Sequence, residues 1–173
     1  MNRRPFLKLA LGASMLAWSS RGRATLYVAT PSDALIARAD VVTLARVESC
    51  GAEWWAGRIL TRAVLACEET FKGAHAPALQ LLVPGGTIDG IAMRVAGYPD
   101  VRAGDRAVLL LAQIHGAPHR LVGAAAGKLD VRIDGGVETI RVPSADGRTA
   151  TRAPLAPFKE SLRAAIERTR RAR

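Results

Sequence analysis

The 173-residue chain has only two cysteines and three histidines, and aromatic residues make up 5% of it. Two cysteines are too few for the disulfide framework of a small secreted scaffold. With few aromatic residues, the core has to be built mainly from Val, Leu, Ile and Ala. The chain also lacks the G-x-S-x-G, P-loop and dinucleotide-binding glycine motifs. The sequence therefore predicts no catalytic residue, no metal site and no cofactor.

Positive charge is concentrated at the two ends of the chain. The formal net charge is +10, yet residues 1–24 hold five basic and no acidic side chains, and residues 148–173 hold eight basic and two acidic ones. The stretch between these ends has a balance of −1. This distribution argues against a basic binding face on the folded domain, and so against nucleic acid as a partner.

The N-terminus is typical of an export signal. Its basic start precedes an apolar run, Leu9–Trp18, and the small residues Gly22 and Ala24 follow. This pattern predicts a signal peptide over residues 1–24. The apolar run is too short for a permanent membrane-spanning helix, so no stable membrane insertion is expected. Residues 3–8 (R-R-P-F-L-K) resemble the twin-arginine export motif, which implies a domain that folds before it reaches the periplasm or the medium.

Residues 25–142 have the pattern of a mainly β domain. The runs 40–50 and 58–72 flank a short segment bounded by glycines, which predicts a hairpin of long strands. In the second run, apolar or small residues alternate with a face that carries the charges. A short helix ending near Ala39 should precede the hairpin, with Thr30 as its N-cap.

Further strands are predicted at residues 78–83, 88–95, 106–113, 127–133 and 137–142. Arg106–Gln113 is apolar on both faces and therefore needs cover on both. Short antiparallel strands with glycines at the corners predict a small closed barrel or a sandwich. Residues 143–153 have the composition of a linker. Helical spacing of apolar residues predicts a basic, amphipathic C-terminal helix over 154–173.

The order of several short motifs resembles the netrin or tissue-inhibitor-of-metalloproteinase type of OB-fold barrel, found also in exported bacterial proteins. The motifs are Ala39-Asp40-Val41-Val42, Phe71-Lys72-Gly73, Gly85-Gly86 and Gly104-Asp105 before an apolar strand. The resemblance covers about residues 33–133 and implies a small OB-like antiparallel β-barrel with protease-inhibitor-like binding. In the inhibitors, a mature N-terminal cysteine presents its amino group to the protease zinc. Here the mature chain would begin at Thr25, so that chemistry is assigned to no residue.

Cys50 and Cys67 would lie in an oxidising compartment after export. With the hairpin turn centred near Trp54, Cys50 would lie opposite Arg58 and Cys67 opposite Val41, which disfavours a disulfide. Cys67 is then a small core residue. A bulge or another register would bring the two cysteines together, so a disulfide stays an alternative.

Trp54 and Trp55, at the expected hairpin tip, are the best candidates for a contact site. Loops at this edge of OB-type barrels often receive ligands, and tryptophan is enriched at interface anchor points. Arg94 and Tyr98 are candidates for lining the same edge. The alternative is that one tryptophan plugs the barrel mouth and the other lies over the N-terminal helix.

The histidines do not form a recognisable site. His115 and His119 are four residues apart, but Gly116 and Pro118 lie between them, so the two cannot share a helical face. They are therefore predicted to be loop residues at the surface.

These patterns point to an exported binding module, periplasmic or secreted, with a protein partner in the cell envelope. A periplasmic enzyme with a site near His115 and His119 is the alternative. The basic C-terminus is either a solvated helix end or a contact for an anionic membrane surface or an acidic partner. The oligomeric state is not predicted.

Overall fold

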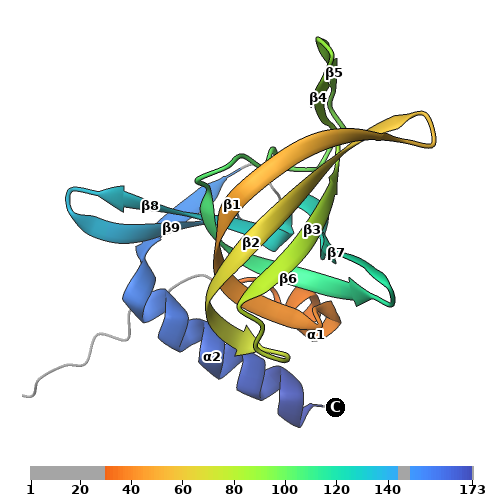
Figure 1. Cartoon of the computed structure of the whole chain (residues 1–173). Helices are drawn as coiled ribbons and strands as arrows, with labels where there is room; N and C mark the ends of the chain where they lie inside the picture. Colours follow the sequence, from red (N-terminus) through yellow and green to blue (C-terminus); the bar gives the residue numbers. More distant parts are fainter. Residues whose placement is uncertain (1–29, 144–148, 173) are drawn as a thin grey trace, which may run out of the picture.

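The computed structural model describes residues 30–143 and 149–172. The expected signal peptide, residues 1–24, lies outside the described residues, as does Thr25. The described chain is mainly β, with a short helix near its start and a longer helix at its end (Figure 1). This confirms the predicted fold class.

The elements follow one another with short connections. In chain order they are α1 (Asp33–Arg38), β1 (Val41–Trp55), β2 (Arg58–Lys72), β3 (Ala78–Pro84), β4 (Gly86–Ile88), β5 (Ile91–Met93), β6 (Arg106–Ile114), β7 (Ala117–Leu121), the 3-10 turn η1 (Ala124–Gly127), β8 (Lys128–Asp134), β9 (Val137–Pro143), β10 (Ala150–Pro154) and α2 (Leu155–Arg171).

Five strands close into a ring in the order β1-β2-β3-β7-β6, because β6 pairs again with β1. Four of the five contacts are antiparallel. The contact between β3 and β7 is parallel and consists of one pair, Leu81 with His119. The second edge of β6 is shared, since β7 pairs with its C-terminal half and β8 with its N-terminal half. From β8 the sheet continues outside the ring to β9 and β10.

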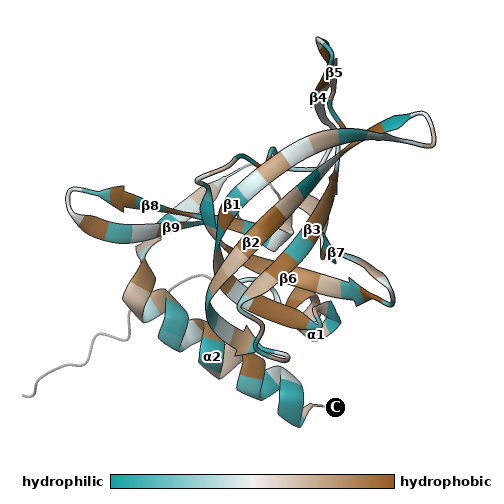
Figure 2. Ribbon diagram, in the orientation of Figure 1, coloured by the Kyte–Doolittle hydropathy of each residue, from teal (hydrophilic) through white to brown (hydrophobic). Residues whose placement is uncertain are grey.

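The strands β1 and β6 separate two hydrophobic cores. On β6, Ala107, Leu109 and Leu111 point into the ring, where they pack with residues of β2 and β3. Val108 and Leu110 point the other way, into a core beneath α1 and α2. Both faces of this strand are thus covered, which confirms the expectation from its sequence, and most of β6 is hydrophobic in Figure 2.

The helix α2 covers the outer core with an apolar stripe at helical spacing. Leu155, Phe158, Leu162, Ala165 and Ile166 are all buried. Burying one side chain of the size of Phe158 or Leu162 contributes roughly 1.5–3 kcal/mol. This packing therefore makes α2 part of the folded domain.

The Phe71-Lys72-Gly73 motif fastens the end of β2 to α1. The Lys72 ammonium donates hydrogen bonds to the carbonyl oxygens of Ile36 (2.7 Å) and Ala37 (3.2 Å), which lie near the end of α1. Gly73 has a φ of +89°, and a Cβ there would lie 2.5 Å from the carbonyl oxygen of Asp40. The motif therefore has a structural role that requires its lysine and its glycine.

Two features near the chain ends differ from the sequence-based expectation. α1 begins at Asp33, and its N-cap is Ser32, whose hydroxyl accepts a hydrogen bond from the Leu35 amide, so Thr30 is not the cap. Thr30 and Ser32 are both good caps, and the sequence alone does not choose between them. Within the expected linker, residues 150–153 belong to β10, which pairs with β9. Only this tertiary pairing makes the segment a strand.

Two turns between strands also differ from the sequence-based expectation. The β1–β2 turn lies at Ala56-Gly57, not near Trp54, and both residues have positive φ. The strand expected over residues 88–95 is instead the hairpin of β4 and β5, which turns at Asp89-Gly90. Asp-Gly is a strong hairpin signal that outweighs the apolar residues on either side.

Candidate binding site at the mouth of the ring

The hairpin of β1 and β2 extends well beyond the ring. β6 pairs with β1 only as far as Arg46, whereas β1 continues to Trp55. The smaller β4–β5 hairpin projects at the same end of the molecule (Figure 1). Two arms therefore flank the mouth of the ring.

Close contact at Gly86 positions the β4–β5 hairpin against the long hairpin. Gly86 has a φ of +142°, and a Cβ there would lie 2.6 Å from the Thr61 hydroxyl and 3.1 Å from the Ala52 side chain. The same hydroxyl donates a hydrogen bond of 2.7 Å to the Gly85 carbonyl. Gly85-Gly86 is thus the point at which the two hairpins approach each other closely.

A groove of about 670 Å³ lies between the two arms and the segment of residues 94–102. Val83 and Val101, which belong to the core inside the ring, form part of its lining. The lining combines small or apolar residues with seven polar ones: Cys50, Thr61, Thr87, Arg94, Tyr98, Asp100 and Arg102. Ligand-binding sites often lie at the mouths of rolled sheets.

Both tryptophans of the long hairpin are exposed to solvent. The exposed fraction is 50% for Trp54 and 61% for Trp55. The alternative in which they plug the mouth and cover α1 is therefore wrong. Neighbours on a strand point to opposite faces, so only Trp54 shares the face of Ala52, which lines the groove.

Exposed apolar side chains gather at this end. Of the seven large hydrophobic residues that are exposed in the described chain, four lie on the two arms or beside the groove: Trp54, Trp55, Ile91 and Tyr98. We call these four residues the aromatic end. Trp54 and Trp55 lie on the arm of β1 and β2, Ile91 lies on the β4–β5 arm, and Tyr98 lines the groove. Ile91 takes this place because of the unexpected β4–β5 turn.

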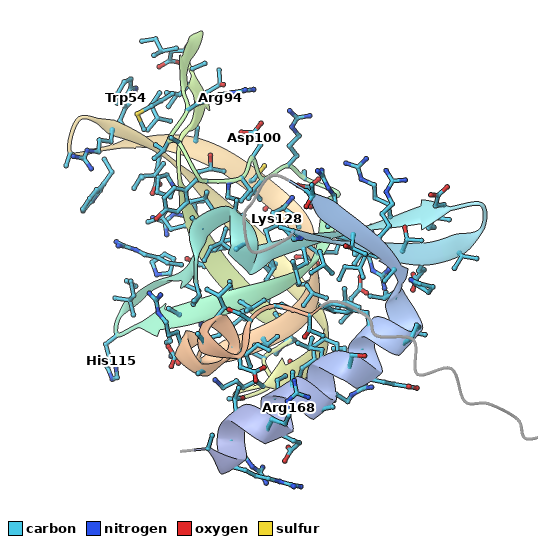
Figure 3. The ribbon with its side chains drawn as sticks, turned by 180° about the vertical axis from the view of Figure 1, so that it is seen from behind. Trp54, Arg94, Asp100, His115, Lys128 and Arg168 are labelled. Carbon is cyan, nitrogen blue, oxygen red and sulfur yellow. The ribbon has the colours of Figure 1, made fainter. Side chains whose placement is uncertain are left out.

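Charges in the groove are only loosely paired. Arg94 and Arg102 each lie 3.7 Å from the same carboxylate oxygen of Asp100. All three side chains are largely exposed, and Arg94 reaches 85%. Exposed pairs of this kind contribute about 0–1 kcal/mol, so both arginines are free to turn toward a ligand. In Figure 3, Trp54, Arg94 and Asp100 lie at one end of the molecule.

The two cysteines are free thiols. Cys67 pairs across the hairpin with Ala45, whereas Cys50 lies five residues further along β1, opposite Ala63. At about 3.3 Å per residue this separation is roughly 16 Å, far beyond the reach of a disulfide. The alternative Cys50–Cys67 disulfide is therefore not formed, although the register also differs from the predicted one.

The surroundings of the two thiols differ. Cys67 packs against the core inside the ring, as predicted. Its burial raises the pKa of the thiol, and a hydrogen bond with Thr43 only partly opposes this. Cys50 is exposed, lines the groove, and directs its Sγ at the Val101 carbonyl (3.7 Å).

The histidines lie on other parts of the surface. His115 is exposed in the β6–β7 turn, away from Trp54 and Arg94 in Figure 3. His119 lies on β7 and not in a loop, because β7 pairs with β6 and β3 and so continues the ring, and its Nδ1 contacts the Gln80 carbonyl (3.3 Å). His75 contacts the Thr70 hydroxyl (3.2 Å). Within residues 30–143 and 149–172, no three His, Cys, Asp or Glu side chains are grouped so as to hold a metal ion.

A second, charged groove of about 700 Å³ adjoins the first at Pro99, Asp100 and Arg102, and no sequence pattern predicts it. The side chain of Lys128 is only 6% exposed and lies 3.0 Å from Asp105 and 2.5 Å from Asp130. Nearby, Arg106 bridges Glu68 (2.8 Å) and Glu138 (2.5 Å). These partners come from β2, β6, β8, β9 and a turn, so no spacing in the sequence could have revealed them. Each carboxylate has a basic partner, and the cluster therefore links β2, β6, β8 and β9 through ion pairs.

The fold and the site define a mainly β protein whose five-stranded ring opens onto a groove between two projecting arms. The chain matches no protein-family model, no curated protein and no solved structure. In the part of the chain that the structure describes, neither helix is long and apolar enough to cross a membrane.

Proposed function

We propose that this protein is an exported binding module that holds a protein partner at the aromatic end. One observation carries the proposal: of the seven exposed large hydrophobic residues in the described chain, three lie on the two arms that flank the groove and a fourth, Tyr98, lines it. Exposed apolar side chains scattered singly are ordinary, whereas a cluster beside a groove is typical of interaction sites.

The apolar area that a partner could cover on Trp54 and Trp55 supports a protein partner. A tryptophan side chain buries about 150–250 Å² when it is fully covered. Trp54 and Trp55 still expose at least half of their surface. Covering roughly 100 Å² on each would stabilise a complex by about 2.5 kcal/mol per residue. Two such anchors at the tip of a stiff hairpin are enough to make this end the energetic centre of an interface.

The place of action is proposed from the N-terminal sequence. Residues 1–24 combine the features of an export signal, with the twin-arginine pattern at residues 3–8. The partner would then belong to the periplasm, the cell envelope or the medium. Resemblance of the strand motifs to the inhibitor-type OB fold makes an envelope protease one class of partner to test.

Capture of envelope proteins by the purified protein tests this proposal. We expect Trp54→Ala and Trp55→Ala each to weaken the captured complex at least tenfold, because each removes a side chain that the partner would bury. Titration with the isolated partner measures the change. Ile133→Ala is the matched control, since Ile133 is 74% exposed but lies on the β8–β9 hairpin. Unchanged affinity in both tryptophan variants would reject the site.

A further inference from the structure

The strand β1 has an open backbone edge beside the groove. β6 covers residues 41–46, and Val47 exchanges backbone hydrogen bonds with Gly104 and Asp105. From Glu48 to Trp55, β2 is the only strand in the described chain that pairs with β1. In an antiparallel pair, alternate residues direct their N–H and C=O groups away from the partner. Half of the backbone groups in this stretch therefore face outward without a strand beside them (Figure 1).

This edge lacks the usual protection against pairing with another chain. Natural proteins protect edge strands with proline, lysine, short length or a cover. Residues 49–52 read Ser-Cys-Gly-Ala, and the nearby Glu53 is held by Arg62 at 2.7 Å. The other open edge of the sheet differs, because β10 is five residues long, ends in a proline and presents Arg152. Unlike β10, the β1 edge is thus long, uncharged over residues 49–52, and open.

Space for an added strand exists next to this edge. Gly51 lines the groove with its backbone alone, and a Cβ built on it meets nothing within 4 Å. Its φ is in the ordinary range, so glycine is not required there by the backbone conformation. The small residues Cys50 and Ala52 lie on either side of it. Residues 48–51 of β1 are also exposed to solvent, so a second backbone can reach the edge there.

We propose that an extended segment of the protein partner adds to the edge of β1 at residues 48–55, with acidic side chains alternating with apolar ones. The backbone of β1 supplies the hydrogen bonds, as in other cases of strand addition. Arg94 and Arg102, which share only Asp100, supply the charge that an acidic side chain would meet. Trp55, on the opposite face of β1, covers the apolar side chains that alternate with the acidic ones. This inference rests on the proposed function and names the partner's binding mode.

A displayed library of random eight-residue peptides is the probe. We expect selection on the purified protein to enrich sequences in which acidic and apolar residues alternate. The best synthetic peptide should slow amide hydrogen exchange at alternate residues within 48–55 at least tenfold. Methylating its backbone nitrogens at every second residue should weaken binding at least tenfold, since those positions can no longer donate to β1. Arg94→Ala should weaken it severalfold, whereas Arg120→Ala, which changes an exposed residue of β7, should not.

Two results would overturn the inference. One is peptide binding at the aromatic end with no added protection of the β1 amides. The other is that those amides are already protected without peptide because the protein forms a concentration-dependent dimer. That result would assign the edge to a second copy of this chain. Failure here is distinguishable from failure of the proposed function. If Trp54→Ala still weakens capture of the envelope partner, the aromatic end is a site and only strand addition is wrong.

Discussion

At the scale of single residues, the site depends on a contact that only glycine allows. The absence of a side chain at Gly86 lets the β4–β5 hairpin start directly against Thr61 and Ala52. The Thr61 hydroxyl then holds the Gly85 carbonyl, which fixes one wall of the groove. The width of the groove is therefore set by two backbone positions and one hydroxyl.

Replacing this glycine should destabilise the protein and disturb the groove. We expect Gly86→Ala to lower the free energy of unfolding by about 1–3 kcal/mol, because it adds a clash to an unfavourable φ. Urea unfolding measures the change. Gly90→Ala is the control, since Gly90 also has a positive φ (+76°) but its Cβ would meet nothing within 4 Å. An equal loss in the two variants would show that backbone strain alone accounts for the effect.

A second residue-scale prediction concerns the cap that Lys72 places on α1. Lys72→Met keeps the aliphatic stem but leaves the carbonyl oxygens of Ile36 and Ala37 without this donor. A loss of about 1–3 kcal/mol is expected, as for other partly buried groups that lose a charged hydrogen-bond partner. Thermal or urea unfolding provides the measurement, with the exposed Arg120→Met as control. If both variants are equally stable, the cap contributes nothing to stability.

At the scale of elements, α2 is held by charge as well as by its apolar stripe. Glu69 on β2 pairs with Lys159 (2.8 Å) and Arg163 of α2, and the Arg163 guanidinium lies 5.4 Å from the Phe71 ring centre. Burial alone would raise the pKa of the Glu69 carboxyl. Hydrogen bonds and charges from Lys159 and Arg163 outweigh that effect and lower its pKa below 4.5.

The lowered pKa of Glu69 predicts how stability depends on pH. The unfolded chain takes up the proton at higher pH than the folded one, so this group's contribution is complete above pH 4.5 and is lost as pH falls through the lower folded value. Glu69→Gln should therefore be less stable than the wild type at neutral pH and lose less stability between pH 5 and about pH 3. Urea unfolding at several pH values tests this. Glu160→Gln, on the exposed side of α2, should keep the wild-type profile.

The sequence predicts strongly patterned elements better than those that depend on pairing. The apolar stripe from Phe158 to Ile166 and the doubly apolar β6 are predicted by the sequence, because buried faces appear there as a pattern of apolar residues. The strand β10 was missed because only Ala153 of its five residues is buried. Trp54, Trp55, Arg94 and Tyr98 were predicted at one edge, but the groove between them was not. Its walls depend on the Gly86 contact and on the turn at Asp89-Gly90.

At the scale of the whole molecule, the proposed location follows from the uneven charge. Basic residues at the start of the chain favour export, while the stretch between the two basic ends is nearly neutral. A neutral body with an apolar, aromatic end fits recognition of a protein better than attraction to a polyanion. The excess of basic residues at the two ends therefore does not describe the binding surface, where Arg94 and Arg102 line the groove.

Export through the twin-arginine route is testable with two conservative changes. Arg3→Lys combined with Arg4→Lys should leave the unprocessed protein in the cytoplasm, because the pair is the part of the signal that this route reads. Fractionation of cells and the mass of the product give the result. The matched control changes Arg21 and Arg23, which lie near the expected cleavage point, to lysine and should leave transport unchanged. Normal export of the first variant would assign another route.

Ring closure between β1 and β6 also has a consequence for the order of folding. Val41 pairs with Leu111, seventy positions further along the chain, whereas the β1–β2 hairpin joins immediate neighbours. Bringing such distant ends together costs roughly 4 kcal/mol of chain entropy before any contact offsets it. The hairpins should thus form early, and the pairing of β1 with β6 that closes the ring should form late and slowly. Until the ring closes, the Val and Leu side chains of its interior stay exposed to water. The nascent chain is most prone to aggregate during that interval.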